Sequence, residues 1–179
     1  MTLLMVLVIC TAMILFELWR EHRYDTLIED AASRYGLDPL LVRAIIKRES
    51  NFRPQVLGKK GEIGLMQVTP VVGREYAARR GGEAVDLKKL CDPRLNIEVG
   101  SWYLSKAMRR YSAFSDPVPF ALAHYNAGAT NVDRWIASTK QRGERGEFIG
   151  AIRYPTTRDY VRFILRRWWW YKLLNTIGV

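Results

Sequence analysis

The chain has 179 residues, enough for one domain with a sizeable core, and 49% of them are hydrophobic. Its 28 lysines and arginines outnumber its 18 aspartates and glutamates, which gives a net charge of +10 and predicts an acidic partner: nucleic acid, an anionic membrane surface or an anionic polymer. No nucleic-acid-binding motif accompanies the charge and the two histidines lie in no ligand cluster, so we expect no nucleic-acid partner and no metal or other cofactor.

The N-terminus carries an apolar stretch. Residues 2–16, TLLMVLVICTAMILF, contain no charge. A transmembrane helix needs about 20 apolar residues, so the stretch is near the lower limit for a membrane span. It could also be a signal sequence, although it lacks a basic start and a small-x-small cleavage site. We therefore predict a retained membrane anchor over residues 1–23, with a cleaved signal as the alternative. Arg20 and Arg23 follow the stretch, which is opposite to the simple positive-inside arrangement for an exported domain.

The remainder, residues 24–179, is predicted to form one compact, mainly α-helical domain. Helical spacing and end signals predict helices over residues 25–36, 38–50, 70–80, from about 96, 118–128, 131–138 and 155–174. Three of these helices begin with a capping residue and a proline, at Asp38–Pro39, Thr69–Pro70 and Asp116–Pro117. Two glycines at 81–82 are expected to end the third helix. Residues 141–150 are predicted to form a polar, glycine-rich loop, and a short β-hairpin between 55 and 64 stays open as an alternative to a loop.

Glu49 is the first candidate for chemistry. In the segment RAIIKRESNF, helical steps from Val42 lead through Ile45 to Glu49, so a carboxylate continues an apolar stripe. It also lies near the C-terminal end of a helix, where the dipole disfavours a negative charge. Both effects raise the pKa of the carboxyl and favour the neutral acid, which can protonate a leaving-group oxygen. The alternative is a solvated glutamate at a helix end.

Two further segments are candidates for ligand binding. In GEIGLMQVTP, residues 61–70, two glycines permit close backbone approach to a ligand, and Gln67 offers a donor and an acceptor. The alternative is an ordinary loop with a buried Leu-Met pair, in which Glu62 is a solvated turn residue. In AHYNAG, residues 123–128, the Tyr125 hydroxyl and the Asn126 amide can bind a carboxyl or a sugar substituent. The alternative there is a helix end with a packed tyrosine and a glycine cap.

Taken together and in this order, ESNF, GEIGLMQVTP, AHYNAG and YPTTRDYV resemble the lytic transglycosylase family of the soluble-lytic-transglycosylase type, which is related to goose-type lysozymes. The resemblance covers about residues 27–170. It implies a lysozyme-like fold and an enzyme that cleaves the β-1,4 bond between N-acetylmuramic acid and N-acetylglucosamine in peptidoglycan, closing a 1,6-anhydro ring on the muramic acid without water. It also implies peptidoglycan glycan strands as partner. With the anchor, it implies a location on the membrane of the bacterial cell envelope, facing the periplasm or cell wall.

The resemblance assigns roles to residues. Glu49 would act as acid and then as base, and Ser50 would position it or the acetamido group. The Tyr125 hydroxyl would lie near Glu49. In the last motif, Thr156 stands where the family usually has glutamate. The residues implied in substrate binding are Ser50, Gly64, Leu65, Met66, Gln67, Tyr125, Asn126 and Tyr160.

Two alternatives to a lyase remain from the sequence. The first is a goose-type lysozyme-like hydrolase, in which Glu62 would be the carboxylate that activates water. The second is a non-catalytic peptidoglycan-binding or secretion-assembly factor, against which the intact Glu49–Ser50 pair argues.

The last predicted helix has an unusual composition. Arg158, Arg162 and Arg166 repeat at i+4, and three consecutive tryptophans follow at 168–170. Basic and aromatic residues together are typical of a membrane interface. The alternative is that the tryptophans pack on the domain and the arginines face solvent.

Overall fold

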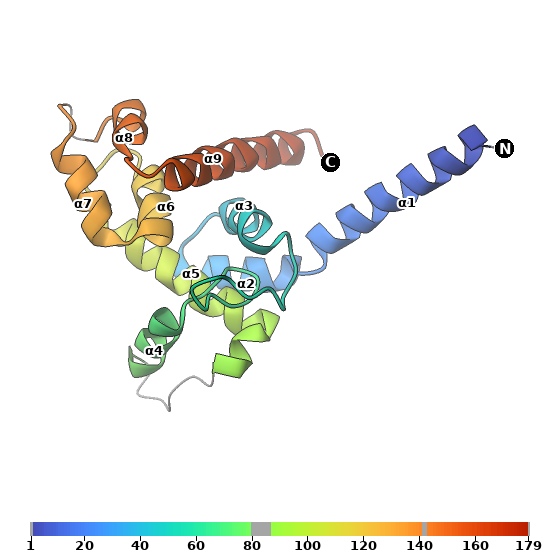
Figure 1. Cartoon of the computed structure of the whole chain (residues 1–179), viewed down its shortest axis with the longest axis horizontal. Helices are drawn as coiled ribbons and strands as arrows, with labels where there is room; N and C mark the ends of the chain where they lie inside the picture. The colour runs from blue at the N-terminus through green and yellow to red at the C-terminus, as the bar shows by residue number, and fades with distance from the viewer. Residues whose placement is uncertain (1, 80–86, 141–142, 179) are drawn as a thin grey trace.

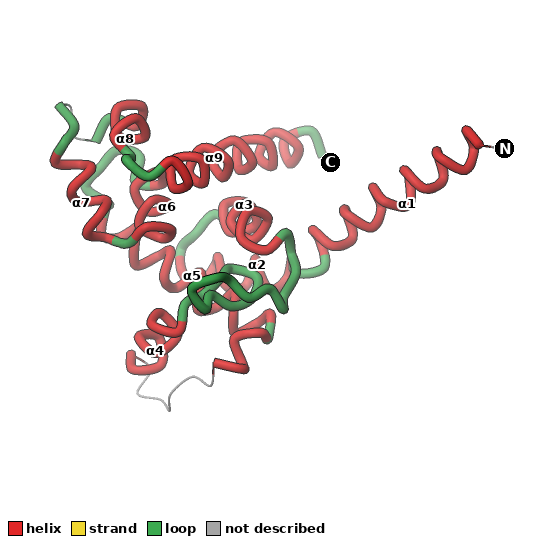
Figure 2. Tube along the Cα trace, in the orientation of Figure 1, coloured by secondary structure: helices red, strands yellow, loops and turns green. Residues whose placement is uncertain are grey.

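The computed structural model describes residues 2–79, 87–140 and 143–178. Within these ranges the chain is helical and has no strand, as Figure 2 shows, so the predicted mainly α-helical fold is confirmed. The elements are α1 Thr2–His22, α2 Asp25–Tyr35, α3 Pro39–Ser50, α4 Pro70–Arg79, the 3₁₀ helix η1 Leu87–Cys91, α5 Pro93–Arg110, α6 Val118–Ala127, α7 Ala129–Ala137, α8 Arg145–Ala151 and α9 Pro155–Thr176.

The core forms around α6, which is apolar on nearly every face. Its residues from Val118 to His124 are all buried, as expected for a helix without a polar side. α6 packs against α5, α7, α8 and α9, while α3 packs on α9 and α2 packs on α3 and α5 (Figure 1). Where the loop between α3 and α4 meets α5, a Cβ on Gly100 would lie 2.5 Å from the Met66 sulfur, so glycine is needed for this close approach.

The predicted helix ends agree well with the structure. Asp38 caps α3 by accepting the Leu40 N–H at 2.8 Å, and Gly36 ends α2 with a φ of 64° in the left-handed region. The helix expected from about residue 96 begins earlier, at Pro93, because Asp92 and Pro93 form another cap-plus-proline start. The glycines at 81–82 lie outside the described residues.

The prediction of a loop over residues 141–150 is wrong for its described part. Glu144 caps α8 by accepting the N–H groups of Gly146 and Glu147. Phe148 is fully buried and its ring centroid lies 4.1 Å from that of Phe120. Tertiary packing of this phenylalanine therefore overrides the low helix propensity of the glycines. Residues 55–64 form no β-hairpin; they contain a turn with isolated bridges from Ile63 to Leu57 and Val68.

α1 projects away from the rest of the molecule (Figure 1). An 18-residue window of this N-terminal segment has a mean hydropathy of 2.1 and none of it is buried, so it has the length and composition of a membrane span. A signal sequence meets the same criteria. The C-terminal end of α1 contacts the domain. There Glu21 forms an ion pair with Lys47 of α3 and accepts a hydrogen bond from the Tyr171 hydroxyl at 2.9 Å.

Candidate active site

Glu49 lies at the end of α3, as the apolar stripe predicts. Val42, Ile45 and Ile46 on the same helix are fully buried. Glu49 keeps some exposed surface, but its carboxyl is largely shielded from water. The hydroxyl of Tyr160, from α9, donates a hydrogen bond to its Oε1 at 2.7 Å. The carboxyl is thus held between α3 and α9, two helices that pack directly on each other.

The environment of Glu49 favours the neutral acid. Burial is the largest influence and raises the pKa of its carboxyl from 4.5 to about 7, with a smaller upward contribution from the charge of Glu62. The hydrogen bond from Tyr160 and the charge of Arg48 lower the pKa and offset part of this rise. A carboxyl with a pKa near neutrality can donate a proton and take one back at physiological pH.

Backbone strain is concentrated around this carboxyl. Asn51 (φ 50°), Phe52 (φ 60°) and Gln67 (φ 48°) are the non-glycine residues with positive φ within the described ranges. Asn51 ends α3, and Phe52 follows with its side chain buried in the core. Such conformations are costly for residues with a Cβ and often occur at functional sites, so their position supports a functional role for this region.

Asn96 of α5 organises the segment 61–70. Its buried side chain accepts the Met66 N–H at 2.7 Å and donates to the carbonyls of Ile63 and Leu90, both at 2.8 Å. Gly64 has a φ of 81°, and a Cβ there would lie 2.4 Å from the Asn96 amide nitrogen. Sequence reasoning missed Asn96, although a lone amide between Leu95 and Ile97 at the start of a helix was the available signal.

Gly64, Leu65 and Met66, which the resemblance implies in substrate binding, are buried in the structure. Leu65 and Met66 expose no surface, and Gly64 is buried against α5. The predicted alternative, a loop with a buried Leu-Met pair, describes the structure. Gln67 donates its amide to the carbonyls of Val56 at 3.0 Å and Gly64 at 2.9 Å, so this amide fixes the loop.

Two of the predicted binding residues donate to consecutive carbonyls of this loop. The Ser50 hydroxyl donates to the Leu65 carbonyl and the Tyr125 hydroxyl to the Met66 carbonyl, each at 2.8 Å. Tyr125 lies close enough to Glu49 for the charge of that carboxyl to raise the pKa of its hydroxyl, after the larger effect of burial. The hydroxyl that donates to Glu49 is that of Tyr160, on a helix that packs on α3. Ser50 and Tyr125 instead join α3 and α6 to the loop beside Glu49.

The last motif connects α9 to α6. Thr157 is buried and donates its hydroxyl to the side-chain oxygen of Asn126 at 2.7 Å. Thr156, where the family usually has glutamate, is exposed in the first turn of α9. Glu62 is partly buried and accepts the Lys60 N–H at 2.8 Å, so it is a turn residue close enough for its charge to affect Glu49.

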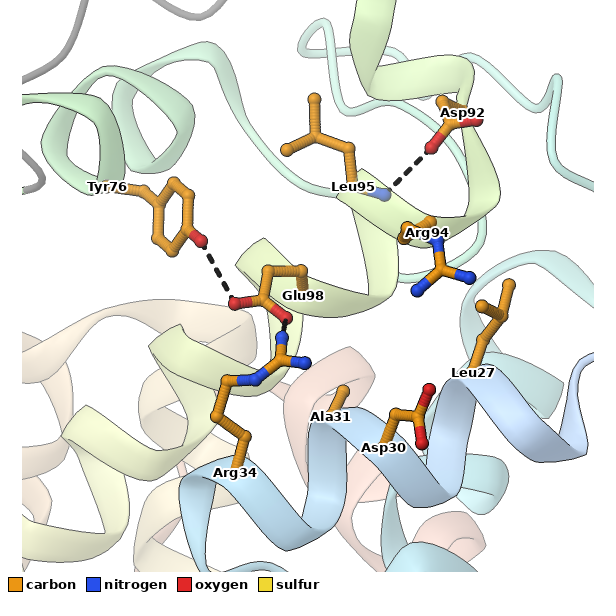
Figure 3. Close-up of a pocket in the computed structure, with 9 residues that line it drawn as sticks. All are labelled: Leu27, Asp30, Ala31, Arg34, Tyr76, Asp92, Arg94, Leu95 and Glu98. Carbon is orange, nitrogen blue, oxygen red and sulfur yellow. Dashed lines mark hydrogen bonds and ion pairs between the residues drawn. The ribbon is translucent and has the colours of Figure 1, made fainter.

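A second buried carboxylate lies elsewhere, in a hollow of about 360 Å³ between α2 and α5. Figure 3 shows Glu98 of α5 between Arg34 of α2 and Tyr76 of α4. Glu98 forms an ion pair with Arg34 and accepts hydroxyl groups from Tyr35 at 2.5 Å and Tyr76 at 3.0 Å. This cluster ties three helices together and gives Glu98 a cationic partner, so Glu49 is the better candidate for proton transfer.

Comparison with known proteins shows the family of this chain. Residues 26–148 match the family model described as the transglycosylase SLT domain. The chain is 38% identical over 127 residues to membrane-bound lytic murein transglycosylase C of Haemophilus influenzae, covering 68% of this chain and 36% of that protein. It is 33% identical over 129 residues to the protein of that name from Pectobacterium atrosepticum, covering 69% and 36%. The chain thus spans about a third of the length of these relatives.

Solved structures show the same fold. The 70 kDa soluble lytic transglycosylase of Escherichia coli superposes with a TM-score of 0.77 at 26% identity, covering 87% of this chain and 24% of that one. An inactive glutamate-to-glutamine variant of the lytic transglycosylase Slt from Pseudomonas aeruginosa superposes with a TM-score of 0.72 at 28% identity, covering 82% and 23%. The chain belongs to the transglycosylase SLT domain family, and the expected lysozyme-like fold is confirmed.

Proposed function

We propose that this domain is a peptidoglycan lytic transglycosylase with Glu49 as its acid and base. The observation that carries the proposal is the shielded carboxyl of Glu49, whose pKa is raised to about 7 while the Tyr160 hydroxyl donates a hydrogen bond to it. The names of the relatives in the same family, lytic murein transglycosylases, support the substrate class. The inactive glutamate-to-glutamine variant of the Pseudomonas aeruginosa relative agrees with a need for a glutamate.

The proposed reaction uses one carboxyl twice. Neutral Glu49 donates its proton to the glycosidic oxygen as the bond to the anomeric carbon of N-acetylmuramic acid breaks. The substrate's own acetamido group stabilises the positive charge on that carbon, which makes a second protein carboxylate unnecessary. Ionised Glu49 then takes the proton from the O6 hydroxyl as O6 bonds to the anomeric carbon. The 1,6-anhydro ring closes and Glu49 is neutral again.

Tyr160 has a positioning role in this scheme. Its hydroxyl donates to Glu49 and therefore stabilises the ionised form that must accept the O6 proton. Ser50, Tyr125 and the buried Asn96 hold the loop beside the carboxyl. Asn126, which the resemblance implies in substrate binding, is exposed at the end of α6, and its side-chain oxygen accepts the Thr157 hydroxyl.

We further propose that the domain works at the bacterial cell envelope, anchored by α1 and facing the periplasm or cell wall. The apolar, unburied α1 and the membrane-bound relatives support this location. The net charge of +10 suits glycan strands with anionic peptides. Fractionation with membranes until detergent is added, and an N-terminal sequence that begins at residue 1, are expected. A mature chain that begins after residue 19 would instead show a cleaved signal.

The chemistry is tested by mass spectrometry of muropeptides released from purified sacculi, with Glu49→Gln as the matched control. Anhydro-muramic ends in the wild-type digest alone are expected. Reducing ends would indicate the hydrolase, which the nearness of Glu62 to Glu49 makes the second candidate. No release above the control would indicate a peptidoglycan-binding factor.

A further inference from the structure

The C-terminal half of α9 exposes large apolar side chains. Trp169 is 61% exposed and Trp170 is 45% exposed, whereas the neighbouring Trp168 donates its indole N–H to Asp38 at 2.9 Å. Leu173 and Ile177 continue the exposed apolar surface, with 40% and 63% of their surface accessible. One of the three consecutive tryptophans therefore packs on the domain, and two face away from it. Exposed apolar groups gathered in this way are typical of an interaction surface.

Basic side chains adjoin these tryptophans. A hollow of about 680 Å³ between the end of α3 and α9 is lined by five basic residues and only one acidic residue, Asp159. A neighbouring hollow of about 340 Å³ shares Arg166 with it and extends to Trp169 and Trp170. Arg162 and Arg166 are exposed, and neither forms an ion pair with any other described residue. Their charges are thus available to an external anion, on the same side of α9 as the tryptophans.

This surface lies beside the point where α1 leaves the domain. Tyr171 of α9 donates to Glu21 near the end of α1, and Figure 1 shows the C-terminal end of α9 and the projecting α1 directed to the same side of the molecule. With a rise of 1.5 Å per residue, Ile177 lies about 9 Å beyond Tyr171, and Phe16 lies about 7.5 Å beyond Glu21 along α1. The exposed end of α9 therefore reaches the level at which α1 becomes continuously apolar.

We propose that Arg162, Arg166, Trp169, Trp170, Leu173 and Ile177 form a membrane-docking strip that rests on a bilayer containing anionic lipids. Tryptophan is favoured at the headgroup level of a bilayer, and guanidinium groups bind lipid phosphates through bidentate hydrogen bonds. The proposal rests on the proposed insertion of α1. Because both α1 and the membrane-docking strip contact the bilayer, the domain does not rotate freely about α1.

The test uses the full chain in nanodiscs whose phospholipids carry bromine, which quenches nearby tryptophan fluorescence. Trp19 of α1 serves as an internal reference for insertion. In the proposed arrangement Trp19, Trp169 and Trp170 are quenched, so the double variant Trp169→Phe/Trp170→Phe should retain about a third of the quenchable emission. Trp168→Phe is the matched control and should leave the quenchable emission unchanged, because Trp168 packs on the domain.

The contribution of the arginines is tested by lipid charge. Quenching of Trp169 and Trp170 should be stronger in discs that contain phosphatidylglycerol than in purely zwitterionic discs, and Arg162→Gln/Arg166→Gln should abolish this difference. Equal quenching of the wild-type chain in both kinds of disc would overturn the role of anionic lipids.

Three results would overturn the strip itself. Quenching confined to Trp19 would mean that α1 inserts and α9 stays away from the bilayer. No quenching of any tryptophan would contradict both the insertion of α1 and the membrane-docking strip. Release of anhydro-muropeptides by the same preparation would still support the proposed chemistry. A dimer in detergent, dissociated by the Trp169→Phe/Trp170→Phe variant, would assign the surface to a second copy of the chain.

Discussion

Glu98 and Glu49, two shielded glutamates in the described part of this domain, differ in how their charge is compensated. Glu98 forms an ion pair with Arg34 and accepts two tyrosine hydroxyls. Glu49 accepts one hydroxyl, from Tyr160, and burial outweighs the lowering effects of that bond and of Arg48 on its pKa. The same side chain therefore joins three helices in one place and is the proposed proton donor in the other. What separates the two roles is the number of donors and cations around each carboxyl.

The largest effect is expected from Glu49→Gln. Glutamine keeps the shape and removes the acid, so release of muropeptides from sacculi should fall by about 10²–10⁴-fold, the scale of general acid catalysis. Folding should be retained, because a neutral amide suits the shielded site at least as well as the carboxylate does. Digestion at the wild-type rate would remove Glu49 from the mechanism and with it the contrast to Glu98.

The pH dependence of stability separates Glu49 from a compensated carboxylate. Its pKa is about 7 in the folded chain and near 4.5 when unfolded, so between these values the folded state binds more protons. The contribution of Glu49 to stability should therefore be fully present below pH 4.5, decline as pH rises to about 7 and stay lost above it, a change on the order of 3 kcal/mol. Denaturant unfolding of the wild type and of Glu49→Gln across this range measures the effect as a difference. A difference that does not change with pH would contradict the raised pKa.

Glu98→Gln should do the opposite of Glu49→Gln. It removes the ion pair with Arg34, so the free energy of unfolding should fall by about 1–3 kcal/mol, the range for hydrogen bonds to charged groups. Turnover per folded molecule should be unchanged. Glu29→Gln, at an exposed position of α2, is the matched control and should leave both quantities nearly unaltered. Loss of turnover without loss of stability would make Glu98 part of the reaction.

The smallest effects distinguish the two tyrosines. Tyr160→Phe removes a donor that lowers the pKa of Glu49, so the alkaline limb of the pH–rate profile should move to higher pH and turnover should fall by roughly tenfold. Tyr125→Phe should cost about 0.5–1.5 kcal/mol of stability through the lost bond to Met66, with the alkaline limb unmoved. If Tyr125→Phe moved that limb instead, the original sequence-based role of Tyr125 beside Glu49 would be restored.

Most of the helices and the candidate acid could be predicted from local patterns in the sequence. Caps such as Asp38–Pro39 and the left-handed Gly36 act within a few residues, so local patterns are enough to locate them. The shielding of Glu49 could also be predicted, because Val42 and Ile45 lie on the same face of the helix and that face is buried in the core. The family could also be predicted from the sequence, because each of its motifs is a short continuous segment of the chain.

The groups that surround that acid depend on tertiary contacts, and they could not be predicted from the sequence. Tyr160 reaches Glu49 across 111 residues of sequence, and no spacing rule connects positions so far apart. The burial of Leu65 and Met66 depends on Asn96 and on the packing of α5. α8 forms despite the low helix propensity of its glycines because Phe148 packs against Phe120. Each of these outcomes rests on contacts between distant segments, whereas helix starts and faces rest on backbone bonds within one turn.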